Sequence, residues 1–363
     1  MTRARPGSAS DVPGINLHAL AQYLPSVLAD YDVQRKLVAR LLTGGRSNLT
    51  YLLSQPGGRK WVLRRPPLGH VMPSAHDMGR EYRTLSALSG HRFPAPRARA
   101  LCTDHSVLGV TFLLYDYTPG LVIATEPAAR GLTTVEANRL SQEVITTLAQ
   151  LHAVHPPAAS PNRSASSTQY LRRQLSRWTQ QWQRTQTREL SDFIRLTRWL
   201  DQTIKNLSND YPVTWVHGDY RLDNLVLDPS TKQVRAVLDW EMSTGGDPLM
   251  DLAVLLVYWE QNGDSLRQHV NVARNLTTQA GFWSRGELLE QYLRLTPHPQ
   301  DHLIPCLALA CLKLAVIMES IHYRHLAGQA VDPLSSGLGD AAPALLQIGM
   351  AVTSGHGLAA LAM

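Results

Sequence analysis

Two short segments carry the side chains that a phosphoryl transfer requires. The first is His217–Asn224 (HGDYRLDN) and the second is Val237–Glu241 (VLDWE). Such a transfer asks the protein to align two substrates, place divalent cations and take up one proton, with little covalent chemistry of its own. Asp219 can accept a hydrogen bond from an acceptor hydroxyl and orient it. Asn224 and Asp239 offer the oxygen ligands that Mg²⁺ prefers.

The spacing of these groups predicts a catalytic loop between strands. Asn224 follows Asp219 across one short loop, with the spacing of the Asp and Asn in the kinase pattern H-R-D-x-x-x-x-N. Apolar strands are predicted at 213–216 and 225–227 on both sides of the loop, and a third, at 234–238, ends just before the metal-binding aspartate. An isolated H-G-D or a lone Asn is more often a turn or cap. The combination of Asp219, Asn224 and Asp239 in this order, next to predicted strands, nevertheless favours a catalytic site.

A glycine-rich turn near the N-terminus predicts a phosphate-binding hairpin. Strands are expected at 37–42 and 49–53, and the turn lies between them. Glycines allow the backbone to approach phosphate oxygens, and neighbouring polar side chains add donors. An ordinary hairpin turn is the alternative interpretation. The residues expected to contact the nucleotide here are Gly44, Gly45, Ser47 and Asn48.

These segments resemble the aminoglycoside phosphotransferase-like family of small-molecule kinases. The motifs that carry the resemblance further are Gly44–Tyr51 (GGRSNLTY), Trp61–Pro67 (WVLRRPP) and His76–Arg83 (HDMGREYR). The match runs from about Leu41 to about Gly328, and it points to a branch whose members are often fused to, or encoded beside, acyl-CoA dehydrogenases. The resemblance implies an α+β, two-lobed protein-kinase-like fold, with a small antiparallel-sheet N-lobe and a larger, mainly helical C-lobe.

The resemblance assigns the phosphate-holding cation of the third strand to Arg64. Protein kinases use a lysine there, paired with a helix glutamate. Lys60 lies on the same strand face and is the competing candidate. The partner would be Glu81, on a helix predicted from about 74 to 88 and in line with its apolar stripe. A solvated Glu81 is the alternative.

The boundary between the lobes is expected near residue 116. Residues 1–116 would form the nucleotide-binding lobe, with a flexible tail at 1–15, and 117–363 the catalytic and substrate lobe. Tyr115 and Tyr117, at the end of a predicted strand, would flank the nucleotide pocket in the family resemblance.

Two further aspartates are expected to support the loop rather than take part in chemistry. Asp251 resembles the buried family aspartate that accepts backbone hydrogen bonds from the catalytic loop. Asp247 is expected to cap an apolar helix that begins at Pro248. Later in the chain, the apolar run at 303–317 contains a proline and Lys313, and predicts a buried helix too short to span a membrane.

Composition is that of an ordinary globular protein with a basic balance. The net charge of +6 and the pI near 9.3 suit an anionic nucleotide and an anionic second substrate. No nucleic-acid motif or membrane segment is expected, and the oligomeric state is left open. Three cysteines without metal-type spacing, and no apolar segment behind residues 1–11, predict a cytoplasmic protein.

Together these residues predict an enzyme, an ATP- and Mg²⁺-dependent small-molecule kinase that phosphorylates a hydroxyl group. A hydroxyacyl-CoA-like metabolite is slightly favoured as acceptor. An antibiotic O-phosphotransferase that confers resistance is the first alternative. A non-catalytic nucleotide-binding protein is the second, because an arginine stands at the lysine position. A protein kinase is disfavoured, since no A-P-E segment follows Asp239.

Overall fold

The computed structural model describes residues 12–42, 48–68, 77–157, 166–208, 210–270, 274–296, 300–328 and 338–362. The chain divides into two compact units. The first comprises residues 1–119 together with 238–241, and the second comprises 120–237 together with 242–363. Residues 238–241 lie between two segments of the second unit in the sequence but belong to the first. This places the predicted metal ligand Asp239 in the first unit.

A five-stranded antiparallel sheet forms the centre of the first unit, in the order β1-β2-β3-β5-β4. The strands predicted from the apolar runs are confirmed, each within two residues of its expected ends. The elements are β1 (Val38–Leu41), β2 (Leu49–Ser54), β3 (Lys60–Arg65), β4 (Ala98–Cys102), β5 (Phe112–Asp116), α1 (Leu17–Tyr23), a 3₁₀ turn (Leu24–Ser26), α2 (Met78–Leu88) and α3 (His105–Leu108).

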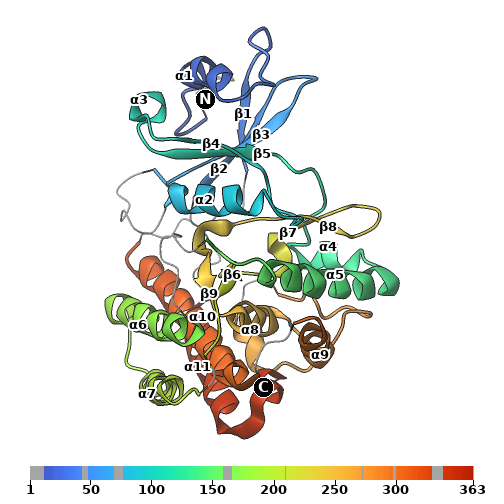
Figure 1. Ribbon diagram of the computed structural model, residues 1–363. Helices are drawn as coiled ribbons and strands as arrows, with labels where there is room; N and C mark the ends of the chain where they lie inside the picture. The colour runs from blue at the N-terminus through green and yellow to red at the C-terminus, as the bar shows by residue number, and fades with distance from the viewer. Residues whose placement is uncertain are drawn as a thin grey trace, which may run out of the picture. The chain divides into compact units, whose positions relative to one another are not determined.

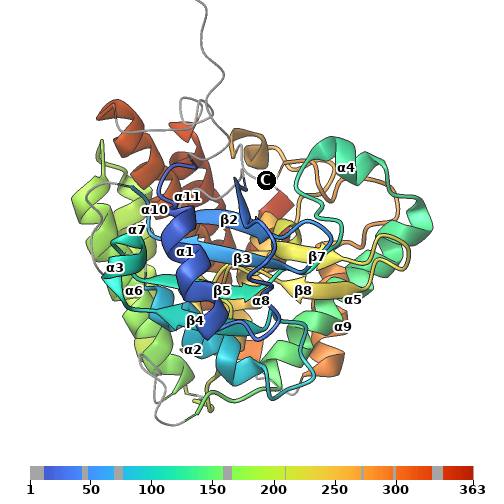
Figure 2. The same cartoon turned by 90° about the horizontal axis from the view of Figure 1, so that it is seen from above.

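The two faces of this sheet have different partners (Figures 1 and 2). Alternate side chains of β2, β3 and β5, such as Leu53, Trp61 and Phe112, pack with Leu20 of α1 in one apolar cluster. The intervening side chains point to the opposite face, where α2 lies against β4 and β5. Because the side-chain period of a strand is two, Arg64 belongs to the face that α2 covers.

The second unit is mainly helical, with two short antiparallel strand pairs, β6 with β9 and β7 with β8. The strands are β6 (Thr214–Val216), β7 (Leu225–Leu227), β8 (Val234–Val237) and β9 (Thr244–Gly246). The helices are α4 (Glu126–Arg130), α5 (Thr134–His152), α6 (Ser167–Thr185), α7 (Ser191–Lys205), α8 (Pro248–Tyr258), α9 (Arg285–Leu295), α10 (Leu303–Leu326) and α11 (Ala341–Ala351). The α+β fold class, an antiparallel sheet followed by a mainly helical part, is confirmed.

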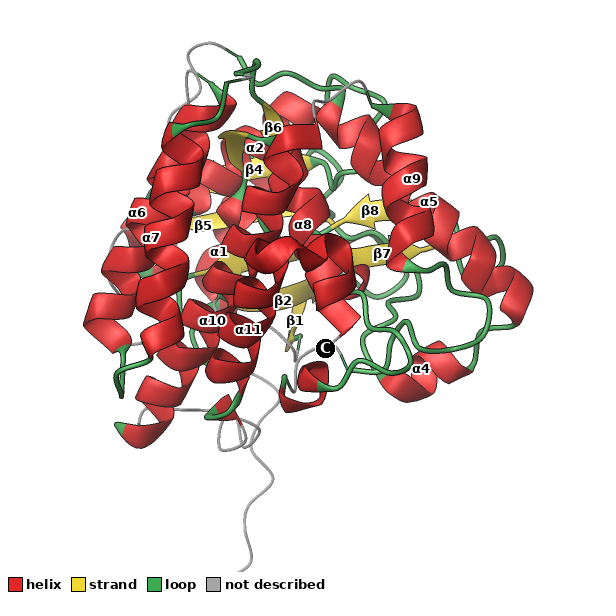
Figure 3. Cartoon of the chain, turned by 90° about the horizontal axis from the view of Figure 1, so that it is seen from below, coloured by secondary structure: helices red, strands yellow, loops and turns green. Residues whose placement is uncertain are grey.

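Helix α10 differs from its prediction in length. It runs without interruption for 24 residues, because Pro305 lies in the first turn, where its missing N–H is not needed. By length and composition, α10 with the preceding turn and the segment 341–362 could each cross a membrane, but 78% of the α10 window is buried inside the protein. Figure 3 shows α10 among the other helices, and it contacts α6, α7, α8 and α11. The predicted burial is confirmed, and the expectation of a helix too short to span was wrong.

Candidate active site

The catalytic loop lies between β6 and β7, as the sequence predicted. Asp219 and Asn224 are close together, because Nδ2 of Asn224 donates to the backbone oxygen of Asp219 at 2.9 Å and approaches its carboxylate at 3.5 Å. This bond uses the amide nitrogen and turns the other end of the amide, the oxygen, away from Asp219. That oxygen is the atom expected to bind a metal.

Asp251 supports the loop from helix α8. Its two carboxylate oxygens accept the backbone N–H groups of His217 at 2.5 Å and of Gly218 at 2.7 Å. His152 also approaches this carboxylate, with Nε2 at 3.4 Å from it and Nδ1 at 2.6 Å from the hydroxyl of Tyr292. A buried carboxylate that accepts several N–H groups has its charge well compensated. The interactions expected from the resemblance are therefore present around Asp251.

Cations around Asp219 keep its carboxyl group ionised. Burial by itself would raise the pKa of Asp219, but the charges of Arg221 and Lys313, with a hydrogen bond from Asn224, outweigh it and lower the pKa below its usual range. Nε of Arg221 lies 3.3 Å from the carboxylate of Asp219 and 3.2 Å from that of Asp223. At neutral pH Asp219 is thus a hydrogen-bond acceptor, as the orientation of a hydroxyl requires.

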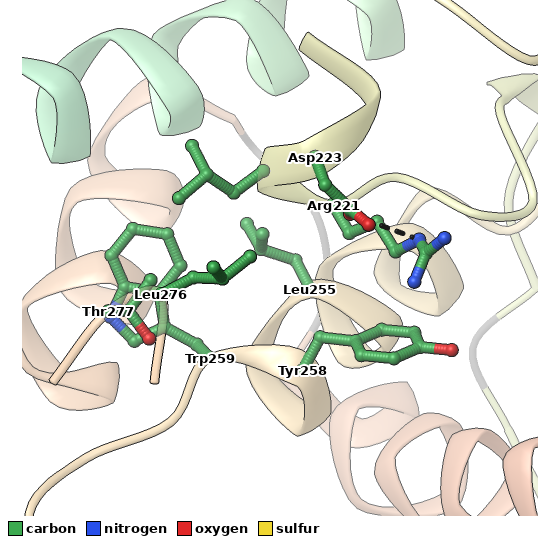
Figure 4. Close-up of a pocket in the computed structure, with 8 residues that line it drawn as sticks. Arg221, Asp223, Leu255, Tyr258, Trp259, Leu276 and Thr277 are labelled. Atoms are coloured by element: carbon green, nitrogen blue, oxygen red, sulfur yellow. Dashed lines mark ion pairs between the residues drawn. The ribbon is translucent and has the colours of Figure 1, made fainter. Parts of the chain in front are cut away.

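The side chain of Arg221 is held in place by an aromatic ring. Its guanidinium carbon lies 5.0 Å from the ring centroid of Tyr258 on α8, a cation–π distance. Both side chains line a small hollow together with Leu255, Trp259 and Leu276, and Figure 4 shows these side chains around it. The hollow therefore borders the catalytic loop.

In the first unit, three carboxylates lie around the guanidinium of Arg64. Nη1 of Arg64 lies 2.8 Å from Glu81, and Nη2 lies 2.9 Å from Asp239 and 3.5 Å from Glu241. The side chain of Glu81 is only 1% exposed and that of Arg64 7%, whereas that of Asp239 is 35% exposed. The solvated alternative for Glu81 is wrong.

The competing cation, Lys60, lies elsewhere. It is exposed, pairs with Ser54 at the end of the β2–β3 hairpin, and its Nζ lies 5.8 Å from the ring of Tyr117. Arg64 instead pairs with strand residues on both sides, Thr50 and Leu113. The geometry thus favours Arg64 over Lys60 as the cation that pairs with the helix glutamate.

The Arg64 cluster carries more negative than positive charge. Burial opposes the charge of Arg64, yet Glu81, Asp239 and Glu241 outweigh it and raise the pKa of the guanidinium well above its usual value. Burial raises the pKa of Glu81 by more than the nearby charge of Arg64 lowers it. Asp239 has a left-handed backbone conformation, with φ of 69°. Its carboxylate is partly exposed and belongs to this negatively charged cluster. Its donor chemistry fits a hard divalent cation.

Other predicted nucleotide-binding residues have different surroundings. Nδ2 of Asn48 donates to Glu241 at 2.7 Å, so this amide is engaged with the acidic cluster. Tyr115 is buried on the face of the sheet that carries Arg64, and burial raises its pKa. Gly44, Gly45 and Ser47 lie outside the described residues, as do residues 1–11 of the predicted tail.

The two halves of the site belong to different units. Asp219 and Asn224 belong to the second unit and Asp239 to the first. Their convergence on one cation stays a prediction. Among the described residues, no group of three or more His, Cys, Asp or Glu side chains is arranged to hold a metal. A kinase magnesium site requires only one or two side chains, because phosphate oxygens and water supply the remaining ligands.

Comparison with known families decides the class of the protein. Residues 38–295 match the profile described as the phosphotransferase enzyme family. The chain belongs to this family. The predicted class, a phosphotransferase of the small-molecule kinase type, is thereby confirmed.

Relatives of this phosphotransferase are longer proteins. The human acyl-CoA dehydrogenase family member 11 is 32% identical over 319 residues, which cover 85% of this chain and 39% of that protein. The mouse acyl-CoA dehydrogenase family member 10 is 32% identical over 315 residues, covering 86% and 29%. The chain thus spans well under half of the length of the curated relatives it matches.

Solved structures share the fold of this phosphotransferase. A candidate aminoglycoside phosphotransferase from Ralstonia eutropha is 26% identical, with a TM-score of 0.77 over 93% of this chain and 98% of that one. The aminoglycoside phosphotransferase APH(4)-Ia, in complex with AMP-PNP and hygromycin B, has a TM-score of 0.57 at 15% identity over 90% and 97%. A choline/ethanolamine kinase family protein from Mesorhizobium loti has a TM-score of 0.59 at 16% identity over 95% and 97%.

Several residues of the site were missed by sequence reasoning. Glu241 and Arg221 lie inside the two motifs, but their roles depend on neighbours from other elements. His152 and Lys313 are far from the motifs in sequence. The available signal for Lys313 was its charge in the middle of an otherwise apolar helix.

Proposed function

We propose that this phosphotransferase transfers the γ-phosphoryl group of ATP, with Mg²⁺, to a hydroxyl group of a small molecule. The observation that carries the proposal is the catalytic loop, in which Asp251 holds the backbone and Asn224 is bonded to Asp219. In the reaction, a bond forms between the acceptor oxygen and the γ-phosphorus, and the bond to the β–γ bridging oxygen breaks. ADP leaves, and the hydroxyl proton passes to Asp219 or to solvent.

Each residue has a defined task in this proposal. Asp219, kept ionised by nearby cations, accepts the hydrogen bond of the acceptor hydroxyl and aims its oxygen. Asn224 and Asp239 would hold Mg²⁺, which would neutralise charge on the phosphates. Arg64 holds the α- and β-phosphates, and Glu81 orients the guanidinium through the 2.8 Å ion pair.

A hydroxyacyl-CoA is the acceptor class that we favour. Support comes from the relatives, which carry the name acyl-CoA dehydrogenase family and contain the region matched by this chain. The basic balance of the protein, with a net charge of +6, suits an acceptor that bears phosphates. The same balance disfavours polycationic aminoglycosides.

An antibiotic acceptor is the second candidate. It is supported by the fold shared with APH(4)-Ia and with a macrolide 2′-phosphotransferase, which is 18% identical at a TM-score of 0.56. A non-catalytic nucleotide-binding role is the third.

The three free cysteines, Cys102, Cys306 and Cys311, are buried, which supports a reducing cytoplasm as the compartment.

The test is a label-transfer assay with the purified full chain. γ-Labelled ATP and Mg²⁺ are offered with hydroxyacyl-CoAs, aminoglycosides, macrolides and nucleoside antibiotics, and the labelled products are separated. We expect Mg²⁺-dependent labelling of a hydroxyacyl-CoA, a loss of at least about 100-fold in Asp219→Asn, and no change in Asp201→Asn, an exposed aspartate on α7. Label on antibiotics alone would favour the second candidate. Absence of labelled product from the whole panel would refute the proposed acceptors.

A further inference from the structure

A charged side chain lies in the middle of the apolar helix α10. Lys313 is 3% exposed, and its neighbours Leu312 and Leu314 are buried. Nζ of Lys313 donates to the backbone oxygen of Gly218, and it lies 5.9 Å from the ring centroid of Trp178 on α6. Within the described part of the chain, no carboxylate lies within ion-pair distance of this ammonium.

Such a lysine costs the fold stability. An ammonium removed from water loses its hydration, and one carbonyl bond with one aromatic ring compensates only part of that loss. Burial accordingly lowers the pKa of Lys313, against the raising effect of the charges of Asp219 and Asp251. A leucine or methionine would fill the same space in α10 without this cost. Groups kept at the expense of stability are typical of functional sites.

The acceptor of the Lys313 bond is the peptide group directly before Asp219. Gly218 is therefore held at both ends, since its N–H donates to Asp251 at 2.7 Å and its carbonyl accepts from Lys313. Gly218 has φ of +85°, and a Cβ there would lie 2.8 Å from Met242. The backbone that leads into Asp219 is thus fixed by one anion from α8 and one cation from α10.

We propose that Lys313 is a positioning residue for phosphoryl transfer, which fixes the Gly218 carbonyl and thereby aims the carboxylate of Asp219 at the acceptor hydroxyl. The inference rests on the proposed function of the loop. It adds a second support to the one that Asp251 provides. Arg221 follows Asp219 by two residues and contacts the Asp219 carboxylate directly. The ring of Tyr258 lies against the guanidinium of Arg221, and Figure 4 shows both side chains. A small shift of an aimed catalytic group is enough to lower the rate strongly.

The experiment compares Lys313→Met, Lys313→Arg and the matched control Leu314→Met in the full chain. Three quantities are measured: kcat and KM with Mg-ATP and 3-hydroxybutyryl-CoA, the thermal midpoint, and hydrogen exchange of the segment 213–224 by mass spectrometry. In Lys313→Met we expect kcat to fall about 10- to 100-fold, the effect of losing one charge-assisted hydrogen bond. KM for ATP stays within about twofold, because the nucleotide contacts assigned to Arg64 are unchanged.

Two further results distinguish positioning from a structural role. The thermal midpoint of Lys313→Met is expected to stay the same or rise, while exchange in 213–224 increases about tenfold. Lys313→Arg, which keeps a cation, should retain more of kcat than Lys313→Met, and Leu314→Met should match the wild type. Activity thus falls without any loss of stability, a combination that a residue which only supports the fold does not produce.

The proposal is overturned if a neutral variant turns over at the wild-type rate, or if exchange in 213–224 is unchanged. It is equally overturned if kcat falls only together with the thermal midpoint and with protection throughout the second unit. If Lys313→Met does not fold, Lys313→Gln is judged by the same criteria. If exchange responds as expected but the wild type labels no acceptor, the support of the loop stands and the proposed function fails.

Discussion

Replacing Arg64 by lysine tests how the nucleotide is held. Two different nitrogens of Arg64 contact Glu81 at 2.8 Å and Asp239 at 2.9 Å. A lysine presents a single ammonium on a side chain without the planar fork, so it keeps one of these contacts well and weakens the other. Loss of one charge-assisted hydrogen bond costs about 1.5–3 kcal/mol, which corresponds to roughly 10- to 150-fold in a rate or binding constant.

We therefore expect Arg64→Lys to lower kcat/KM for ATP by about 10- to 100-fold. Initial rates of label transfer over a range of ATP concentrations, with acceptor in excess, measure the effect. The same variant should lower the free energy of unfolding by about 1–3 kcal/mol, because the buried carboxylate of Glu81 is less well compensated. Urea denaturation followed by fluorescence measures this second quantity.

The matched control is Lys60→Met, at the exposed cation on the same strand face. It should leave kcat/KM for ATP within about twofold of the wild type, since surface substitutions seldom have larger effects. The opposite pattern, in which Lys60→Met loses activity and Arg64→Lys does not, would show that Lys60 holds the phosphates. It would refute the role that we give to the Arg64–Glu81 pair.

Three further outcomes are expected. Asp251→Asn should lower both the thermal midpoint and kcat, because the 2.5 and 2.7 Å bonds from the catalytic loop lose a charged acceptor worth about 1.5–3 kcal/mol each; wild-type values of both would contradict the support role. Gly218→Ala should yield little folded protein in a solubility and circular dichroism assay, since φ of +85° and a 2.8 Å approach to Met242 leave no room for a methyl group. Glu136→Gln should be less stable than the wild type at neutral pH. The N-terminal backbone of α5 and Lys232 lower the pKa of Glu136 from 4.5 to about 2, so the carboxylate stabilises the folded state above about pH 4.5. Denaturation midpoints should therefore converge as pH falls from about 4.5 towards 2, and a constant gap would count against it.

Much of the fold and half of the site were predictable, because they depend on local patterns. The strand at 49–54 and helix α8 follow from the hydrophobic period and from the cap at Asp247. The pairing of Asn224 with Asp219 depends on five residues of one loop, so its spacing in the sequence was sufficient. Strand period also placed Arg64 and Lys60 on one face, but it could not choose between them.

The family resemblance favoured Arg64, and tertiary structure showed that Arg64 is the cation that contacts Glu81 and supplied the supports of the loop. Arg64 lies between two neighbouring strands, whereas Lys60 lies at a hairpin end, and this difference appears only when β5 pairs with β3. Lys313 reaches Gly218 across 95 positions of sequence, and Asn48 reaches Glu241 across 193. Local propensity extends over one or two turns of helix or one strand, so it determines which face a side chain occupies. The partner that it meets there is determined by how distant elements pack, and that is why the charged network around Asp219 became visible only in the folded chain.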